Sequence, residues 1–322
     1  MRRRTFITVV GLAVGWACVA RAQRPNNVPR IGFLSPTSTH PYISAFMEGL
    51  RDLGYVEGKS IVIDFRSAEE EYDRLPALAA ELVRLGPDVL VTYSNPAVAA
   101  IKGATSTIPI VIVLSGDAVD AGLVESLHHP GRNITGQTFF NPELNAKRLD
   151  LLKEAVPGAR RVGVLCNPAN PVTRRVLEAM TNTAGSLHLE LQPFEVRRSI
   201  EFASTLSGMK PNSVEAIVLV EDVITLDNVK LVGDFAVAER LPAIGFLGLA
   251  EAGGLMSYGV DFPYLFRHGA TFVDRIIKGA RPDELPMEQP SKFRFVVNLR
   301  TAKVLGLTLP SSLLEFADDV IE

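Results

Sequence analysis

The chain has 322 residues, of which 47% are hydrophobic and 21% are charged, and its formal net charge is −3. This is the composition of a globular protein with about two domains, and a mildly acidic balance excludes the basic footprint that nucleic-acid binding requires. Two cysteines are too few for a disulfide framework.

Residues 1–22 are typical of a secretory signal peptide. Three arginines at 2–4 precede the uncharged apolar run "TFITVVGLAVGWACVA", and Ala-Arg-Ala at 20–22 supplies small residues for cleavage. We therefore expect cleavage after Ala22 and a periplasmic mature chain. The apolar run is short for the alternative, a membrane anchor. Residues 3–7 also resemble a twin-arginine signal, so the general and twin-arginine export routes both stay open.

Removal of this segment leaves 29 basic against 36 acidic side chains, a net charge of about −7, and a single cysteine, Cys166. No internal disulfide is then possible. Cys18 raises the alternative of a lipoprotein, although Gly15 stands where such signals usually carry leucine. Cys166 follows an expected strand, where it is interpreted as a small buried residue rather than a nucleophile.

The first half of the mature chain alternates apolar strands with amphipathic helices. The Val- and Ile-rich strands and the helices between them are expected at these positions: strands 30–34, 60–65, 88–93 and 109–114, and helices 41–53, 71–85 and 95–104. Near-continuous apolar strands separated by helices indicate a parallel sheet that is covered on both faces.

The pattern recurs in the second half of the chain. Its elements are expected at these positions: strands 161–165, 187–191, 216–220 and 242–246, and helices 170–184 and 225–240. The openings "GFLSPTSTHPYISAF" and "GVLCNPANPVTRRVL" share the order strand, polar loop, proline and helix. The sequence therefore predicts an α/β fold of two similar Rossmann-like lobes with parallel sheets.

The polypeptide is expected to cross between the two lobes at several points. Residues 133–139 and 255–262 are interpreted as crossings, and a helix at 264–278, a proline-rich linker at 279–290 and a strand at 293–299 complete the lobes. The predicted boundaries are 28–139 plus 259–282 for the N-terminal lobe and 140–258 plus 283–322 for the C-terminal lobe.

The stretch "GYVEGKS" at 54–60 suggests a phosphate-binding loop at first sight. The pattern needs a glycine at position 53, which is Leu53, and it must follow a strand and open a helix. Here it closes a helix and enters a strand, so Gly54 is expected as a left-handed helix cap and Gly58 as a turn residue. No glycine-rich dinucleotide motif follows a strand either.

The usual catalytic and metal-binding motifs are not found in this sequence. None of the five histidines pairs with another histidine or a cysteine at ligand spacing, and no G-x-S-x-G elbow occurs. His128 and His129 are interpreted as the end of a helix. We therefore expect no catalytic residue, no metal and no cofactor.

Polar and aromatic residues gather instead where expected strands end. In a parallel sheet, ligands bind beyond the carboxyl ends of the strands. Hydroxyls, amides and helix starts near 39, 95 and 118 suit a polar group or a carboxylate, acidic side chains suit an ammonium, and aromatic rings suit an apolar body. The same residue types also make ordinary caps and turns. The candidate ligand-binding residues are Ser35, Thr37, His40, Tyr93, Ser94, Asn95, Gly116, Asp117, Phe139, Asn167, Glu221, Asp222 and Phe246.

Several stretches resemble one known family along essentially the whole mature chain. They include "LRDLGYVEGKSIVIDFR", "DVLVTYSNPAVAAIK", "GDAVDAGLVESLHHPGRNITG" and "YGVDFPYLFRHGATFVDRIIKGARPDELPMEQPSKFRFVVNLRTAKVLGLTLP". These are similar to the ABC-transporter substrate-binding protein family that includes tryptophan- and tyrosine-binding members. One departure is visible at 116–119, where this chain has Gly-Asp-Ala-Val and the family often has Gly-Asp-Pro-Val. The loss of that proline puts the local loop shape in doubt.

The resemblance implies a type I periplasmic binding protein with three crossovers and a ligand in the cleft. Hinges are then expected near 138–141, 256–259 and 282–290. The implied function is a monomeric solute-binding protein that delivers an amino acid or aromatic compound to an ABC permease by hinge closure. The alternatives are an exported sensor that presents its ligand to a membrane receptor, and an exported enzyme on the same fold. A cytoplasmic repressor is disfavoured by the signal peptide and by the lack of a helix-turn-helix domain before residue 30.

Overall fold

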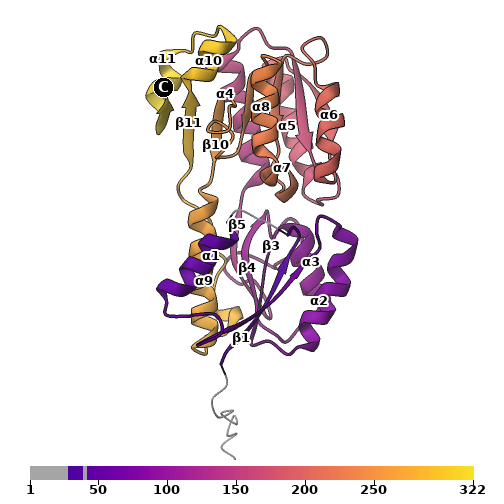
Figure 1. Ribbon diagram of the computed structural model, residues 1–322, viewed down its shortest axis with the longest axis vertical. Helices are drawn as coiled ribbons and strands as arrows, with labels where there is room; N and C mark the ends of the chain where they lie inside the picture. Colours follow the sequence, from indigo (N-terminus) through magenta and orange to yellow (C-terminus); the bar gives the residue numbers. More distant parts are fainter. Residues whose placement is uncertain (1–27, 39–41) are drawn as a thin grey trace, which may run out of the picture.

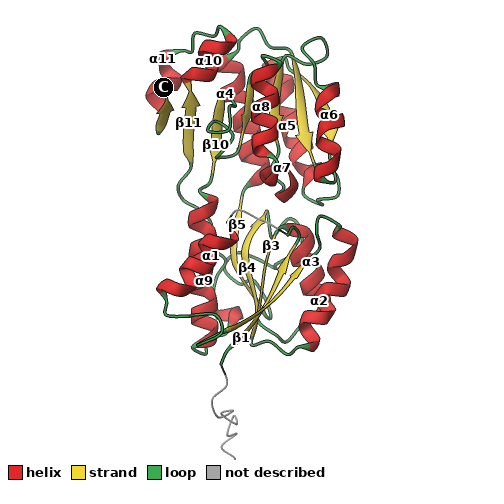
Figure 2. Ribbon diagram, in the orientation of Figure 1, coloured by secondary structure: helices red, strands yellow, loops and turns green. Residues whose placement is uncertain are grey.

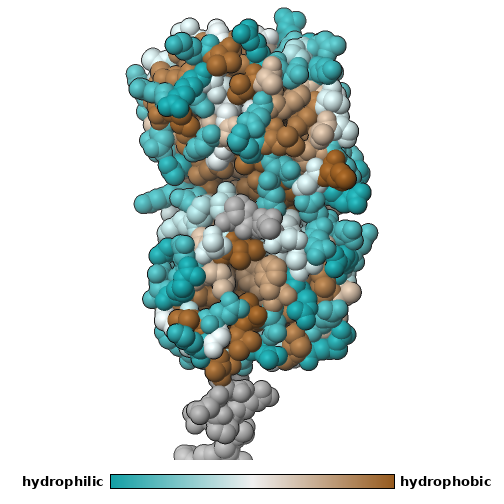
Figure 3. Space-filling model, in the orientation of Figure 1, coloured by the Kyte–Doolittle hydropathy of each residue, from teal (hydrophilic) through white to brown (hydrophobic). Residues whose placement is uncertain are grey.

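The computed structural model describes residues 28–38 and 42–322 and contains two lobes stacked along the long axis of the molecule (Figure 1). Each lobe is a β-sheet with helices on both faces (Figure 2). The expected signal peptide and His40 lie outside the described residues. The outer face shown in Figure 3 carries many hydrophilic side chains on both lobes.

The N-terminal lobe contains a five-stranded parallel sheet in the order β2-β1-β3-β4-β5. Its strands are β1 (Arg30–Ser35), β2 (Val62–Ser67), β3 (Val89–Tyr93), β4 (Ile110–Gly116) and β5 (Ile134–Phe139), and its helices are α1 (Ile43–Asp52), α2 (Leu75–Arg84), α3 (Asn95–Ala104) and α9 (Phe262–Ile277). All residues of β3, β4 and β5 are buried, and β3 and β4 are mainly apolar, whereas β5 (ITGQTF) also buries polar side chains. Helices α1 and α9 pack together on one face, and α2 and α3 pack on the other.

The C-terminal lobe contains a seven-stranded sheet in the order β12-β11-β10-β9-β8-β6-β7. Its strands are β6 (Arg161–Cys166), β7 (Glu190–Glu195), β8 (Ala216–Leu219), β9 (Ala243–Gly245), β10 (Met256–Gly259), β11 (Arg294–Asn298) and β12 (Asp319–Ile321). Its helices are α4 (Asn141–Ala155), α5 (Thr173–Leu187), α6 (Phe202–Gly208), α7 (Val223–Asp227), α8 (Val229–Ala238), α10 (Leu299–Leu305) and α11 (Ser311–Phe316). Strand β11 runs antiparallel to β10, and the other pairs are parallel.

The two lobes share one topology. Strands β7-β6-β8-β9-β10 repeat the order of β2-β1-β3-β4-β5, so the prediction of two similar α/β lobes is confirmed. In such sheets the strand order reverses between the first and third strands, and a ligand crevice forms at that point. The chain passes between the lobes three times: from β5 to α4, from β10 to α9, and after the short helix η3 (Pro282–Glu284) on the way to β11.

The stretch at 54–60 lies between α1 and β2, as expected, and does not open a helix. Gly54 follows the end of α1 with φ +90, and Gly58 has φ +75. Both values fall in the left-handed region that favours glycine.

Some local predictions were wrong. The expected strand 187–191 begins only at Glu190, because α5 continues to Leu187 and His188 closes it with φ 54. The expected helix 225–240 is two helices, α7 and α8, that meet at Asn228. His128 and His129 do not end a helix, since the chain from 117 to 133 is a series of turns and bends. For the same reason, no helix starts at 118.

Candidate ligand-binding site

The carboxyl ends of the central strands of both sheets face each other between the lobes. Strands β1 and β3 end at Ser35 and Tyr93, and β6 and β8 end at Cys166 and Leu219. These are the points of strand-order reversal in the two sheets, so the loops that follow them form the expected position for a ligand.

A pocket with a cavity volume of about 50 Å³ lies at this position. Seven of the sequence-predicted residues line it: Tyr93, Ser94, Asn95, Gly116, Phe139, Glu221 and Asp222. Leu114, Ser115, Asn141, Asn170, Val223, Leu226, Phe262 and Phe266 complete the lining. Both lobes contribute residues to this lining.

Aromatic rings form one wall of the pocket. The rings of Tyr93 and Phe266 meet edge to face with centroids 5.2 Å apart, and those of Phe139 and Phe262 do so at 5.9 Å. Sequence reasoning missed Phe262 and Phe266, which lie four residues apart on one face of α9 and therefore point the same way. The wall offers a surface on which an apolar or aromatic ligand stacks.

A strained residue precedes helix α3 at the pocket. Ser94 has φ 68 and ψ 147, a conformation that non-glycine residues rarely adopt, and its buried Oγ has no hydrogen-bond partner among the described residues. The adjacent Asn95 is fixed by Gly116, because its Nδ2 donates to the carbonyl at 2.6 Å and its Oδ1 accepts from the backbone N–H at 2.9 Å. The start of α3 thus presents polar groups in a rigid frame.

Beneath the pocket, Glu221 forms a buried ion pair with Arg148 of α4. The side chains are 3% and 0% exposed, and Arg148 Nη1 donates to Glu221 Oε2 at 2.7 Å. Arg148 also donates to the carbonyl oxygen of Tyr258 at 2.8 Å, and Asn145 Nδ2 donates to Glu221 at 2.8 Å. The carboxylate of Glu221 is therefore neutralised inside the protein. The sequence analysis did not single out Arg148, Asn145 or Asn141, since helix α4 was not predicted.

Asp222 is held by donors from both lobes. Asn167 and Asn170 each donate to it at 2.9 Å, the backbone N–H of Ile224 donates at 3.0 Å, and the Tyr72 hydroxyl donates across the cleft at 3.2 Å. Burial raises the pKa of Asp222, and these donors oppose the shift. Asp222 also caps α7, so its carboxylate has a structural role beside its position at the pocket.

The remaining predicted residues lie outside the pocket lining. Ser35 lies behind Tyr93 and shares a hydrogen bond with its hydroxyl at 2.7 Å, while Thr37 lines a neighbouring polar cavity. Asp117 accepts from the backbone N–H of Asn141 at 3.3 Å. Asn167 touches the site only through Asp222. Phe246 is fully buried in the hydrophobic core.

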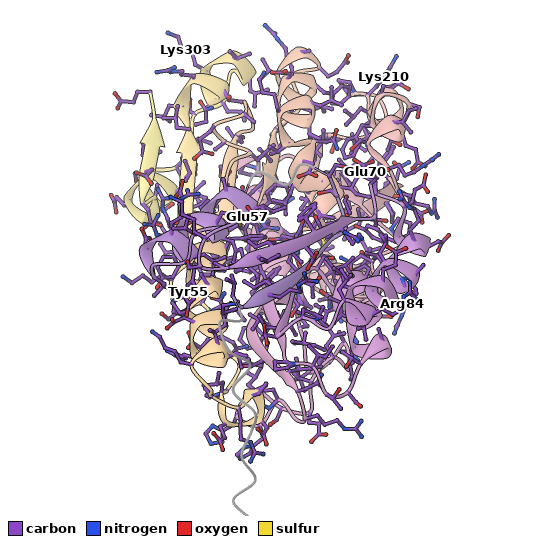
Figure 4. The ribbon with its side chains drawn as sticks, turned by 60° about the horizontal axis from the view of Figure 1, so that its bottom comes forward. Tyr55, Glu57, Glu70, Arg84, Lys210 and Lys303 are labelled. Carbon is purple, nitrogen blue, oxygen red and sulfur yellow. The ribbon has the colours of Figure 1, made fainter. Side chains whose placement is uncertain are left out.

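Direct contacts join the lobes around the pocket. Besides Tyr72 and Asp222, the backbone N–H and the hydroxyl of Ser199 donate to Glu70 at 2.7 and 2.5 Å. Figure 4 shows Glu70 where the N-terminal lobe approaches the C-terminal lobe. Arg175 pairs with Asp120 at 3.1 Å. These contacts join the two lobes on the sides of the pocket.

Within residues 28–38 and 42–322, no cluster of three or more His, Cys, Asp or Glu side chains is arranged to hold a metal ion. In the same part of the chain, no helix combines the length and the apolar character needed to cross a membrane.

Comparison with known proteins places this architecture in context. The tyrosine-binding protein of Clostridioides difficile (strain R20291) is 25% identical over 280 residues, which cover 85% of this chain and 80% of that protein. The structure of an ABC domain from Streptococcus pneumonia in complex with L-Trp is 28% identical and has a TM-score of 0.80, covering 90% of this chain and 100% of that chain.

A ligand-free, open structure of a substrate-binding protein with adhesive properties from Clostridium difficile is 25% identical and has a TM-score of 0.62, covering 91% of this chain and 99% of that chain. The model of the family described as ABC transporter substrate binding protein matches residues 28–321. The fold is that of a type I periplasmic binding protein, and the chain belongs to the ABC transporter substrate-binding protein family.

Proposed function

We propose that this protein is the periplasmic component of an ABC importer and delivers an amino acid or a related aromatic compound to a permease. The observation that carries the proposal is the pocket between the lobes, where an aromatic wall faces polar groups at the ends of both sheets. An apolar pocket with a few convergent polar groups is the usual form of a small-molecule site. The tyrosine-binding relative and the L-Trp complex support an aromatic amino acid.

The mechanism we propose is hinge closure around the ligand. The three crossings after β5, after β10 and around 282–290 serve as hinges between the lobes, for which we propose the boundaries 28–139 plus 259–282 and 140–258 plus 283–322. A ligand that touches both lobes stabilises the closed state. The greater similarity to the L-Trp complex than to the open, ligand-free structure supports the view that the arrangement described here is the closed one.

The cellular location and partners are part of the proposal. The N-terminal segment, with three arginines, an apolar run and Ala22 at the cleavage site, supports export and release into the periplasm. We propose that the mature protein acts as a monomer that docks on its permease without a cofactor.

A thermal-shift screen of the purified protein against amino acids, aromatic acids and sugars tests the binding function. A ligand at about 100 times its dissociation constant adds about 2.7 kcal/mol of stability, which gives a clear shift. Because the only tryptophan, Trp16, lies in the expected signal peptide, indole emission from the processed protein reports bound tryptophan directly. If the unfolded, dialysed and refolded protein responds to no small solute, the proposal fails. Transport into vesicles that contain the cognate permease tests delivery.

A further inference from the structure

A second, polar cavity lies between the lobes next to the pocket. We call it the acidic cavity, and its lining includes Thr37, Glu69 and Glu70 from the N-terminal lobe and Ser199, Asp227 and Asn228 from the C-terminal lobe. Among the described residues, its lining contains three carboxylates and no lysine or arginine. A concave surface lined by one sign of charge attracts ligands of the opposite sign.

The acidic cavity and the pocket are neighbours through two short connections. Asp227 directly follows Leu226, which lines the pocket from α7. On the other side, the Ser35 hydroxyl donates to the Thr37 carbonyl at 2.5 Å and also pairs with the hydroxyl of Tyr93 in the pocket wall. The two cavities therefore lie side by side between the lobes.

Two polar atoms at the acidic cavity are buried without a hydrogen-bond partner among the described residues. They are Oγ1 of Thr37, a residue that is only 1% exposed, and Oδ1 of Asp227. A buried carboxylate oxygen without a donor is costly in free energy, and such atoms are rare in native structures. Each of these atoms is able to accept a hydrogen bond from a ligand.

The two acidic side chains that line the pocket, Glu221 and Asp222, already have partners. The charge of Glu221 is neutralised by Arg148, and Asp222 accepts hydrogen bonds from Tyr72 and Asn167. The sequence analysis named Glu221, Asp222 and Asp117 as counter-ions for an ammonium and did not name Asp227.

The electrostatic surroundings of Asp227 favour a cation. Burial, with smaller contributions from the nearby charges of Glu70 and Asp222, raises the pKa of this carboxyl to about 7, and the Thr37 hydroxyl opposes the shift. A cation beside Asp227 stabilises its ionised form and offsets the repulsion from Glu70 and Asp222.

We propose that the ligand carries a primary ammonium group and that Asp227 is its counter-ion, with Thr37 Oγ1 as a second acceptor. An ammonium group has three N–H donors. It therefore suits a site that offers several hydrogen-bond acceptors and carries no positively charged side chain. The proposal deepens the proposed function and rests on it, because it names the chemical class of the ligand: an aromatic amine or amino acid rather than an aromatic acid.

Isothermal titration calorimetry with matched pairs of solutes at about pH 8 tests this assignment. The pairs are L-tyrosine with 3-(4-hydroxyphenyl)propanoate, L-phenylalanine with 3-phenylpropanoate and L-tryptophan with indole-3-propanoate, so that each pair differs only in the amine. We expect at least one amine-bearing member to bind about 100-fold more tightly than its partner.

The variant Asp227→Asn is expected to lower the affinity for that amine-bearing solute by about 100-fold. Its affinity for the matched solute without the amine is expected to change by less than about threefold. Since Asp227 Oδ1 has no hydrogen-bond partner in the described part of the chain, this variant is expected to fold, and its melting temperature without ligand is the check. Asp234→Asn is the matched control, because Asp234 is an exposed acid that pairs with Lys230 on the surface of α8. This control is expected to bind like the wild type.

The possible failures separate the two proposals. Equal binding of both members of a pair, or an Asp227→Asn variant with unchanged amine affinity, overturns the ammonium assignment and leaves the binding function standing. Binding by no member of any pair overturns the assignment to this ligand class, and a response in the wider solute screen then decides the binding function separately. Stabilisation by Ca²⁺ alone that Asp227→Asn abolishes also overturns the assignment, since the site then takes a metal ion.

Discussion

Arg148 and Glu221 form a buried ion pair that joins helix α4 to the end of β8 directly under the ligand pocket. Arg148 is among the largest fully buried side chains of the protein. It binds both oxygens of Glu221 and the carbonyl oxygen of Tyr258 in β10. The pair therefore fixes three elements of the C-terminal lobe on which the pocket is built.

Replacement of Arg148 by methionine is expected to destabilise the protein by about 3–5 kcal/mol, because Glu221 is left charged and buried without its partner. Urea unfolding measures the change. Adding Glu221→Leu to the same chain is expected to recover much of the loss, since an apolar pair of similar volume often replaces a buried ion pair without a net cost. A loss below about 1 kcal/mol for the single variant contradicts this account.

Much of the fold was predictable from the sequence because apolar runs and helical periodicity are local signals. Helix 95–104 and strands β1 to β4 of the N-terminal sheet lie within about two residues of their expected positions, whereas β5 was expected only as a crossing. Helix α4 was not predicted, since its buried face includes Asn141, Asn145 and Arg148 and so lacks a clear apolar stripe. The periodicity of a helix that buries a polar network is hidden from a pattern based on hydrophobicity.

The site was only partly predictable for a related reason. Residues directly after strands were located correctly, because parallel sheets bring those positions together. Phe262 and Phe266 come from α9, which follows the second crossing and approaches the pocket only through the tertiary arrangement. The roles of Glu221 and Asp222 were also not predictable, since the side chains that donate to them are 52 to 150 residues away in sequence.

The hydroxyl of Tyr72 links the lobes through Asp222, and its loss is expected to weaken ligand binding. Tyr72→Phe removes one hydrogen bond to a carboxylate, worth about 1.5 kcal/mol, from the closed arrangement. We expect affinity to fall about tenfold, with a small effect on the stability of the free protein. Calorimetric titration gives the affinity.

Tyr55→Phe is the control for this experiment. Tyr55 donates to Asp274 at 2.9 Å, and α9, which carries Asp274, packs in the same lobe as Tyr55 (Figure 4). The removal of this hydroxyl therefore leaves the contacts between the lobes in place. If the two variants weaken binding equally, the link between the lobes is not the cause.

Asp117 is expected to make the stability of the free protein depend on pH. Burial raises the pKa of its carboxyl from 3.8 to about 7 in the folded protein. Between these values the folded state binds more protons than the unfolded state, so stability is expected to fall as the pH rises from about 4 to about 8. The shift corresponds to about 4 kcal/mol for a fully buried group, and partial exposure reduces the expected contribution to about 1–2 kcal/mol.

The variant Asp117→Asn tests this contribution through melting temperatures across that pH range. Its stability is expected to exceed that of the wild type at high pH and to vary less with pH. Asp150→Asn, a change at an exposed position of α4, is expected to follow the wild-type curve. A wild-type curve that rises with pH through this window excludes the proposed role of Asp117.

Ser94 is expected to lower the stability of the protein and to strengthen its binding of ligand. Its φ of 68 and ψ of 147 are strained for any side chain, and such strain is worth about 1–3 kcal/mol at sites where the surrounding structure enforces it. Ser94→Gly relieves the strain and removes the buried hydroxyl that has no partner among the described residues. We expect the variant to be about 1 kcal/mol more stable and to bind ligand about tenfold more weakly.

Ser94→Ala separates the two effects of that substitution. Alanine keeps the strained backbone and removes only the hydroxyl, so it is expected to bind as weakly as Ser94→Gly without the same gain in stability. Chemical unfolding and calorimetric titration of the three proteins give both quantities. If Ser94→Ala binds like the wild type, the hydroxyl does not contact the ligand, and any weakening in Ser94→Gly then comes from a looser start of helix α3.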